Sequence, residues 1–405
     1  MWDVEAVRSD FPILQSKAHC KPLVYLDNAA TTHKPRAVLD ALEDYYTRRN
    51  SNVHRSAHYL SGLAGEAYEQ ARETVQGHLH ARSPREIVFT SGTTEAINLV
   101  ARCFCEPPLA PGEEIVVSAM EHHSNLVPWQ MLCQERGAAL KVMPVNEDGA
   151  LDADRAEEQI TDATRLVAVT EVSNALGTVN PLERLIRKAH AHGAAVLVDG
   201  AQAIPHGAVD VQAMDCDFYA FSAHKLYAET GTGVLYGKQE WLEQMRPWLY
   251  GGGMIDSVDW ESTRFAEPPY RFEAGTRHVA GAVSLAAAIR YLDELGWEGL
   301  ARHEQDVLRY AMNRLSEENG VTVYGTAWPK YSVVSFVLDG IQCLDAASIL
   351  DKMGIAVRSG HHCAQPLMKQ FGIEGTVRVS LACYNKLEEV DALMEGIGRL
   401  RQMLK

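Results

Sequence analysis

The chain has 405 residues, of which 46% are hydrophobic and 22% are charged, which is typical of a folded globular protein with two or three domains. Its 53 acidic and 38 basic residues give a net charge of −15, which disfavours binding to nucleic acid or to an anionic membrane surface. The N-terminus lacks the pattern of a signal peptide, and no uncharged apolar run is long enough to span a membrane. We therefore expect a cytoplasmic protein that acts on a small molecule.

Short β-branched runs alternate with helical patterns through the first two thirds of the chain, which predicts an α/β fold with a mainly parallel sheet covered by helices. The predicted strands are 85–91, 114–119, 165–172, 194–199, 217–222 and 232–237. Residues 181–192 combine one apolar face with a proline in the first turn and a glycine directly after the end, so they predict a helix.

The character of the sequence changes after about residue 251. Residues 251–276 are rich in glycine, aromatic and charged residues and show little periodicity, which is typical of a long functional loop or hairpin. The elements expected after it are helices near 281–295, 297–318, 345–353 and 387–403 and strands near 321–324 and 332–338. They predict a separate α+β unit that packs closely on the first.

Three polar segments each follow a predicted strand, at the edge where ligands bind in open α/β sheets. Residues 91–95, Ser-Gly-Thr-Thr-Glu, can form a phosphate cradle at a helix N-terminus, although Ser and Thr are also common helix caps. Asp199 ends an apolar run and needs a partner, which is a structural arginine, a helix N-terminus or a pyridinium nitrogen. Lys225 follows the strand predicted at 217–222, and on its own it is an ordinary solvated lysine. Next to a cofactor it would be a nucleophile, because burial lowers the pKa of its amine.

The eight cysteines form no CxxC pair, and most of them lie in apolar or helical stretches, which argues against a disulfide framework. Cys363 differs because it follows His361 and His362 and lies near an arginine, and such positive surroundings favour the thiolate. Metal binding by these three residues is the alternative. Three consecutive side chains seldom point at one ion, so we expect no metal.

Six motifs occur in order along the chain: TSGTTEAIN, EHHSNLVPW, VDGAQ, FSAHK, RFEAGT and RSGHHCA. In these motifs the sequence resembles the cysteine desulfurases of the SUF type (group II) of the class-V aminotransferase family, from about residue 10 to the C-terminus. The resemblance implies the type I, aspartate-aminotransferase-like fold of PLP-dependent transferases. It implies a large domain at 25–270 that binds pyridoxal 5′-phosphate, and a small domain from 1–24 and 271–405 that carries the catalytic cysteine loop.

The resemblance also implies roles for individual residues. Lys225 is expected to bind the cofactor covalently, Cys363 to receive sulfur, and His122 to stack on the cofactor ring and to move protons, whereas His123 is expected to be a packed side chain. The other expected cofactor ligands are Thr93, Thr94, Asp199, Gln202, Ser222 and His224, with Thr276 supplied by a second subunit. The expected substrate ligands are Asn174, Arg358 and Arg378.

Two segments depart from the family pattern. Ala228-Glu229 replaces a common Gly-Pro, and Arg277-His278 replaces a Pro-Asn. Neither change removes a catalytic group, but each could alter loop stiffness, cofactor affinity or the subunit interface. From the residues alone, Arg378 could also be a surface charge at a strand edge, although its neighbours Val377 and Val379 are apolar.

The activity implied by the resemblance is conversion of L-cysteine to L-alanine, with the sulfur left on Cys363 as a persulfide. A homodimer is expected, and relatives pass the sulfur to a SufE-like or SufU-like acceptor protein for iron–sulfur cluster assembly. The rivals are an aminotransferase, an amino-acid epimerase, a selenocysteine lyase or a non-catalytic scaffold. The first two do not need Cys363, and selenocysteine is a possible second substrate. A scaffold would have no physical reason to keep Lys225, Asp199, His122 and Cys363 together.

Overall fold

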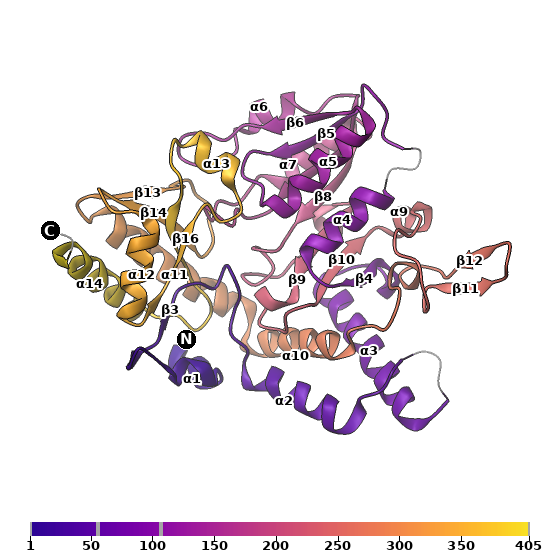
Figure 1. Cartoon of the computed structure of the whole chain (residues 1–405), viewed down its shortest axis with the longest axis horizontal. Coiled ribbons are helices and arrows are strands. Elements are labelled where there is room, and N and C mark those ends of the chain that lie inside the picture. The colour runs from indigo at the N-terminus through magenta and orange to yellow at the C-terminus, as the bar shows by residue number, and fades with distance from the viewer. Residues whose placement is uncertain (1, 54–56, 105–107, 404–405) are drawn as a thin grey trace.

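The computed structural model describes residues 2–53, 57–104 and 108–403 (Figure 1). Its largest sheet has the strand order β4-β10-β9-β8-β7-β5-β6. The strands are β4 (Ile87–Thr90), β5 (Glu114–Ser118), β6 (Ala139–Met143), β7 (Thr164–Thr170), β8 (Ala195–Asp199), β9 (Phe218–Ser222) and β10 (Gly233–Gly237). Strands β5 to β9 pair in parallel, and β10 is antiparallel to both of its neighbours. The predicted mainly parallel sheet is therefore confirmed.

Strand β8 shows why helices cover both faces of this sheet. All of its residues are buried, and successive side chains of a strand point to opposite faces. Ala195 and Leu197 belong to a core cluster that includes α4 (Thr93–Cys103) and α5 (Val127–Arg136). Val196 and Val198 belong to another cluster, with α7 (Leu182–Ala191) and α10 (Val279–Leu295). Helix α7 confirms the helix predicted over 181–192.

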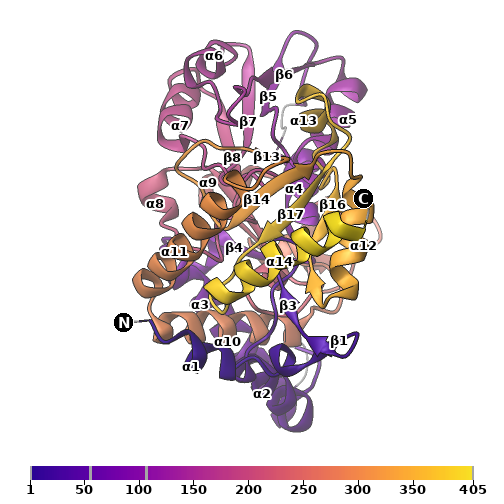
Figure 2. The same cartoon turned by 90° about the vertical axis from the view of Figure 1, so that its left-hand side faces the viewer.

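A second sheet is smaller and antiparallel (Figure 2). Its order is β13-β14-β17-β16, formed by β13 (Val321–Tyr324), β14 (Val333–Leu338), β17 (Thr376–Ser380) and β16 (Arg358–Gly360). The helices α11 (Trp297–Ser316), α12 (Cys343–Lys352) and α14 (Leu387–Met403) share a core cluster with these strands. The predicted α+β unit after the large sheet is therefore confirmed.

The N-terminal segment joins this smaller unit. Strand β3 (Val24–Tyr25) pairs in parallel with β15 (Ile355–Ala356), and Ser380 N donates to Leu26 O at 2.7 Å. Helix α10 lies within the range predicted for the small domain, but it packs against α2 (Arg36–Asp44) and α3 (Tyr59–His78). The proposed division into 25–270 against 1–24 with 271–405 stays a prediction.

The stretch 251–276 contains the antiparallel hairpin of β11 (Ile255–Val258) and β12 (Thr263–Phe265), which projects from the body in Figure 1 and confirms a hairpin there. The remaining α-helices and β-strands of the described residues are α1 (Val4–Ser9), α6 (Ala153–Glu158), α8 (Val211–Met214), α9 (Gln239–Gln244), α13 (Gln365–Gln370), β1 (Lys17–Ala18) and β2 (Lys21–Pro22). Within the described ranges, no helix combines the length and apolar character needed to cross a membrane.

Candidate active site

The predicted site residues converge on a cavity of about 290 Å³ at the C-terminal ends of β7, β8 and β9, closed by β16, β17 and the segment after β3. Of all the predicted site residues, only Thr276 does not line it. The predicted residues that line it are Thr93, Thr94, His122, Asn174, Asp199, Gln202, Ser222, His224, Lys225, Arg358, Cys363 and Arg378. Their roles stay predictions, but the fold places them around one volume.

Lys225 lies in a short 3-10 turn, Ala223–Lys225, directly after β9. The hydroxyl of Thr32 donates to the carbonyl oxygens of His224 and Lys225, at 3.1 Å each, and so fixes the turn. Burial and the positive charge of Arg378 lower the pKa of Lys225 to about 8, although Asp199 and Cys363 act in the opposite direction. A sizeable share of this amine is therefore neutral near pH 7 to 8, which suits a nucleophile or a base.

Asp199 is the last residue of β8 and is 4% exposed. Its Oδ1 accepts a hydrogen bond from Ala201 N at 3.0 Å, and burial raises its pKa while Lys225 opposes the rise. No arginine within the described residues forms an ion pair with Asp199, so the structural-arginine alternative is not realised there. Its carboxylate lines the cavity and can hold a cationic ring nitrogen.

Hydroxyl groups gather at the N-terminus of α4. Ser222 Oγ accepts from Thr93 N at 2.8 Å and lies 2.7 Å from Thr93 Oγ1, while Thr94 Oγ1 lies 2.8 Å from Ser124 Oγ. Burial and Lys225 lower the pKa of His224 to about 4, and its Nδ1 is buried without a partner in the described structure. Hydroxyls, a helix N-terminus and an unused imidazole nitrogen together fit a phosphate group.

His122 is a neutral imidazole with a defined tautomer. Its Nδ1 accepts a hydrogen bond from Ser124 N at 3.0 Å, which leaves the ring proton on Nε2. Burial, with a smaller contribution from Lys225, lowers its pKa to about 3. His123 instead contacts the loop of residues 361–365, here called the cysteine loop. Its backbone N donates to Cys363 O at 2.7 Å, and its Nε2 accepts from Gln365 N at 3.2 Å.

The cysteine loop has a strained backbone. His362 and Cys363 both have left-handed φ angles, 53° and 55°, which cost roughly 1–2 kcal/mol each in a residue other than glycine. Hydrogen bonds hold the loop in this shape: Asn174 Nδ2 donates to His362 O at 2.6 Å, His123 N donates to Cys363 O, and Cys363 N donates to His361 Nδ1 at 3.1 Å. Cys363 remains exposed while it lines the cavity, so its thiol can meet both a small substrate and a partner.

The two histidines beside Cys363 do not contribute equally to its surroundings. His362 is buried, its Nε2 lies 2.8 Å from Thr376 Oγ1, and burial and Arg378 lower its pKa to about 3. It therefore supplies no positive charge at neutral pH. The positively charged groups near Cys363 are Lys225, Arg358 and Arg378. Cys363 acts to raise the pKa of each of them, although burial lowers the pKa of Lys225 and Arg378 overall. Among the described residues, no three or more His, Cys, Asp or Glu side chains converge as metal ligands.

Arg378 is not the strand-edge surface charge that was the alternative from sequence. Strand β17 lies between β14 and β16, and the Arg378 side chain is only 3% exposed. Its Nη1 donates to Asn174 O at 2.9 Å, and burial lowers its pKa to about 10. Arg358 occupies the neighbouring strand and its side chain is 47% exposed. Both guanidinium groups line the cavity, as expected for carboxylate binding.

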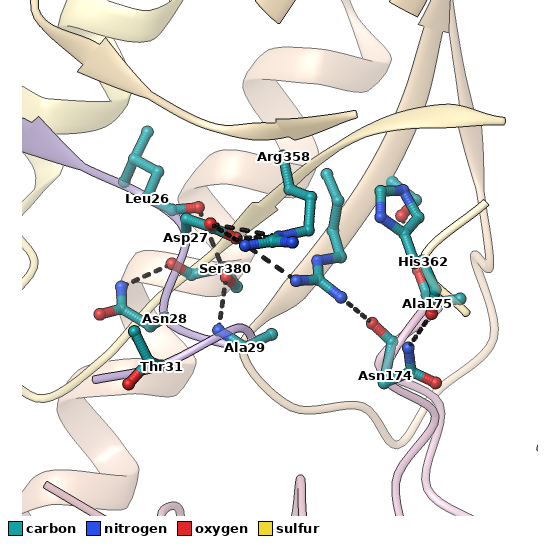
Figure 3. Close-up of polar contacts among 12 residues, drawn as sticks. Leu26, Asp27, Asn28, Ala29, Thr31, Asn174, Ala175, Arg358, His362 and Ser380 are labelled. Carbon is teal, nitrogen blue, oxygen red and sulfur yellow. Dashed lines mark hydrogen bonds and ion pairs between the residues drawn. The ribbon is translucent and has the colours of Figure 1, made fainter. Parts of the chain in front are cut away.

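Sequence reasoning missed Asp27, which contacts both arginines and whose carboxylate lies against Arg358 in Figure 3. Asp27 Oδ2 accepts from Arg358 Nη2 at 2.9 Å, and Asp27 Oδ1 lies 3.4 Å from Arg378 Nη2. The signal was present, because Asp27 ends the apolar run Val-Tyr-Leu in the same way that Asp199 ends a longer one.

Sequence reasoning also missed two carboxyl groups near Asp199. Glu121 accepts from Thr170 N at 2.9 Å and from Asn125 Nδ2 at 2.6 Å, and burial raises its pKa to about 8. Glu171 accepts from Tyr219 Oη at 2.7 Å, and burial raises its pKa to about 7. Each of them follows a strand of the large sheet. The same position at the end of a strand was the sequence feature by which Asp199 was selected. Each is largely or partly protonated at neutral pH.

Thr276 lies away from this cavity, along two others of about 440 and 180 Å³. Its expected role in a partner subunit's site stays a prediction. The two departures from the family pattern meet here, because His278 Nε2 lies 3.5 Å from Glu229 and His278 Nδ1 lies 2.9 Å from Thr232 Oγ1. They link the loop after Lys225 to the loop that carries Thr276.

Comparisons with known proteins agree with this geometry. Residues 24–393 match the family model of class-V aminotransferases. A cysteine desulfurase of Dickeya dadantii (strain 3937) is 50% identical over 404 residues, which covers 100% of this chain and 98% of that protein. A cysteine desulfurase of Salmonella agona (strain SL483) is 48% identical over 402 residues, which covers 99% of each.

Solved structures show the same likeness in three dimensions. The cysteine desulfurase CsdA (S-sulfonic acid) from Escherichia coli superposes with a TM-score of 0.92 at 40% identity, covering 100% of this chain and 99% of that chain. The apo cysteine desulfurase from Thermococcus onnurineus NA1 superposes with a TM-score of 0.93 at 40% identity, covering 98% of each.

Proposed function

The chain belongs to the class-V aminotransferase family as a PLP-dependent cysteine desulfurase of the type I fold, and we propose that it moves the sulfur of L-cysteine to Cys363 as a persulfide and releases L-alanine. One observation carries this proposal: Lys225, Asp199 and Cys363, each from a different part of the chain, line one cavity of about 290 Å³. An aminotransferase or epimerase would need the first two residues but not an exposed cysteine beside them.

The residues of the cavity fit pyridoxal 5′-phosphate. Asp199 offers a buried carboxylate for the ring nitrogen, the hydroxyls at the N-terminus of α4 and the unused Nδ1 of His224 suit the phosphate, and Lys225 suits the aldehyde. Gln202 lies beside them, with its Nε2 donating to Ala29 O at 2.8 Å. The bound cofactor supplies an electron sink that stabilises negative charge at Cα of the amino acid.

The substrate is oriented by its carboxylate. Arg378 and Arg358 offer guanidinium donors in a fixed fork geometry, and Asn174 lies beside them, held by Arg378 Nη1. Lys225, whose pKa is lowered to about 8, then takes the proton from Cα through its neutral Nζ. His122 carries its ring proton on Nε2 at neutral pH, which suits hydrogen-bond donation within the cavity.

The sulfur transfer itself balances with the groups at hand. The Cys363 thiolate attacks the substrate Sγ, so a bond forms between the two sulfur atoms and the substrate Cβ–Sγ bond breaks. The electron pair of the broken bond stays with Cβ, which takes up a proton. Cα takes back a proton from Lys225, and L-alanine leaves. The sulfur remains on Cys363 as a persulfide. Storing the sulfur on an exposed side chain prepares it for a second protein.

Mass spectrometry of the holoenzyme after incubation with L-cysteine tests the proposal. We expect one added sulfur atom on the peptide that contains Cys363. Cys363→Ser should keep the absorption of the bound cofactor but lose alanine release. Cys20→Ser is the matched control, because Cys20 is also exposed but lies outside the cavity, and it should react normally. Alanine release from Cys363→Ser at the unaltered rate, or sulfur on Cys20, would contradict the persulfide role.

We further propose that the persulfide is passed to a SufE-like or SufU-like acceptor for iron–sulfur cluster assembly, and that the protein is cytoplasmic. The exposure of Cys363 supports transfer to a partner protein. Selenocysteine is a proposed second substrate, because selenium leaves carbon more readily than sulfur does. Sulfur transfer from the loaded enzyme to purified acceptors tests the first point, and alanine release with selenocysteine tests the second.

A homodimer is also proposed. The supporting observation is that Thr276, expected in a cofactor site, lies outside the cavity of its own chain. Light scattering on the purified holoenzyme should give twice the chain mass. Thr276→Ala should weaken cofactor affinity without changing that mass, and unaltered affinity would remove Thr276 from the cofactor site.

A further inference from the structure

Arg358 and Arg378 stand directly opposite each other on adjacent antiparallel strands. The register of β16 and β17 pairs Arg358 with Arg378. Like charges at directly opposed positions of a sheet repel and destabilise it. The repulsion is poorly screened here, because the Arg378 side chain is only 3% exposed and its charge is largely removed from water. This pair therefore needs an anion between its two guanidinium groups.

Asp27 is that anion. Arg358 donates to both of its oxygens, from Nε to Oδ1 at 3.0 Å and from Nη2 to Oδ2 at 2.9 Å. Arg378 Nη2 lies 3.4 Å from Oδ1. Figure 3 shows the Asp27 carboxylate with the Arg358 guanidinium lying against it. One carboxylate thus spans both cations.

The backbone fixes Asp27 in this place. Asp27 forms a parallel bridge with Ser380 of β17, and Ala29 N donates to Ser380 Oγ at 2.8 Å. A few residues further on, Thr31 and Thr32 donate to His224 O at 3.1 Å each. The segment therefore connects the strand that carries Arg378 to the turn that carries Lys225. Asp27 is 15% exposed and does not belong to a free surface loop.

We propose that Asp27 is a positioning residue for the substrate carboxylate, which holds Arg358 beside Arg378 and leaves the pair with one net positive charge. This inference rests on the proposed role of the two arginines in binding the carboxylate of cysteine. Two guanidinium groups and one aspartate match a single carboxylate in charge. Asp27 also occupies the Nε and Nη2 edge of Arg358, so it fixes the direction in which the remaining donors face.

Loss of the charge at Asp27 should release Arg358. Its side chain is 47% exposed, so without a counter-charge it can move into water and away from Arg378. For Asp27→Asn we expect the KM for L-cysteine to rise about tenfold, as for the loss of one charge-assisted hydrogen bond. The kcat should stay within about twofold, because Asp27 touches none of the reacting atoms. Asp27→Glu keeps the charge and should raise KM by less than about threefold.

Three controls separate this role from a general loss of structure. Cysteamine is cysteine without the carboxylate, and its binding to the holoenzyme, followed by cofactor absorption, should be the same in Asp27→Asn. Asp391→Asn makes the same change in an aspartate paired with Arg314, outside the cavity, and should leave KM unaltered. In an Arg358→Ala background, Asp27→Asn should add less than about twofold to KM, because the residue through which it acts is gone.

The outcomes are distinct. An unaltered or lower KM for Asp27→Asn would overturn the inference, and so would an equal loss of cysteine and cysteamine binding. If Asp27→Asn does not fold, Asp27→Glu decides, since a tenfold KM increase despite the retained charge would count against the positioning role. If the unaltered enzyme releases no alanine from cysteine, the proposed function itself fails. If it does and Asp27→Asn matches it, only the role of Asp27 fails.

Discussion

Glu273 is the centre of a buried ion-pair network, and removal of its charge should destabilise the protein strongly. Its side chain is 1% exposed, accepts hydrogen bonds from Arg72 Nη1 at 2.7 Å and Phe89 N at 2.9 Å, and forms an ion pair with Arg277, whose Nε lies 3.0 Å away. Arg72 and Arg277 are themselves 1% and 6% exposed. Removing one partner of a buried pair leaves an uncompensated charge and costs about 3–5 kcal/mol. We expect a loss of that size for Glu273→Gln.

The same change should show the pH dependence of the network. The two arginines hold the pKa of Glu273 below its ordinary value of 4.5, against the effect of burial. The stabilisation is therefore complete above about pH 4.5 and is lost as the pH falls through the lower folded-state pKa. The unaltered protein should lose stability in that acid range, and Glu273→Gln should lose less there.

Urea unfolding of the cofactor-saturated protein, followed by tryptophan fluorescence, measures the loss. Glu69→Gln is the matched control, because Glu69 also pairs with Arg72, at 3.0 Å, but is 33% exposed. A partly exposed pair contributes less than about 1 kcal/mol. Equal unfolding midpoints for Glu273→Gln and Glu69→Gln would refute the reasoning. Because Phe89 lies in β4 and Arg277 follows Thr276, we also expect Glu273→Gln to weaken cofactor binding.

Three further predictions concern the cavity and the carboxyl groups near it. The rate at which the apoprotein takes up pyridoxal phosphate, followed by absorbance, should rise with pH and level off above about 8, since only the neutral amine of Lys225 reacts; a flat profile would contradict the lowered pKa. Arg378→Lys should raise the KM for cysteine at least about tenfold with a smaller change in kcat, because an ammonium group cannot bridge Asn174, Asp27 and a carboxylate. Burial raises the pKa of Glu121 to about 8, so the unaltered protein should lose stability as the pH rises from about 5 to 8. Glu121→Gln has no such carboxyl group, so its stability in urea unfolding should rise relative to that of the unaltered protein over this range.

Much of the fold could be predicted because its elements are strongly periodic. The six strands predicted for the large sheet and the four helices predicted after residue 280 appear within two or three residues of their expected bounds, whereas α13 was not predicted. Strand β6 was not predicted, because it is an edge strand with mostly exposed or half-buried residues and so lacks an apolar run. Strands β16 and β17 were not among the predicted strands, although Arg378 of β17 was considered as a charge at a strand edge; β16 is short and has only polar and small residues.

The residues of the candidate site likewise divide into those that the sequence predicted and those that it did not. Lys225, Asp199 and Cys363 could be selected from sequence because two of them directly follow apolar strand patterns and the third follows two histidines, and because all three lie in motifs that resemble one family. The sequence did not show which residues near Cys363 carry positive charge in the folded protein. His361 and His362 look alike in sequence, but only the structure shows that His362 is buried against Thr376 and neutral, and that Lys225, Arg358 and Arg378 are cations near Cys363.

The sequence by itself determined which chemical groups are available and on which kind of element each one lies. Only the tertiary structure decided which of them meet. Asp27 and Arg378 are separated by 351 residues and come together because β3 pairs with β15 and Ser380 binds the segment after β3. Local periodicity reports how a segment buries its own side chains, and it carries no information about which distant strand completes the sheet. For that reason the lysine and the cysteine could be named as candidates from the chain, whereas the carboxylate that spans the two arginines could not.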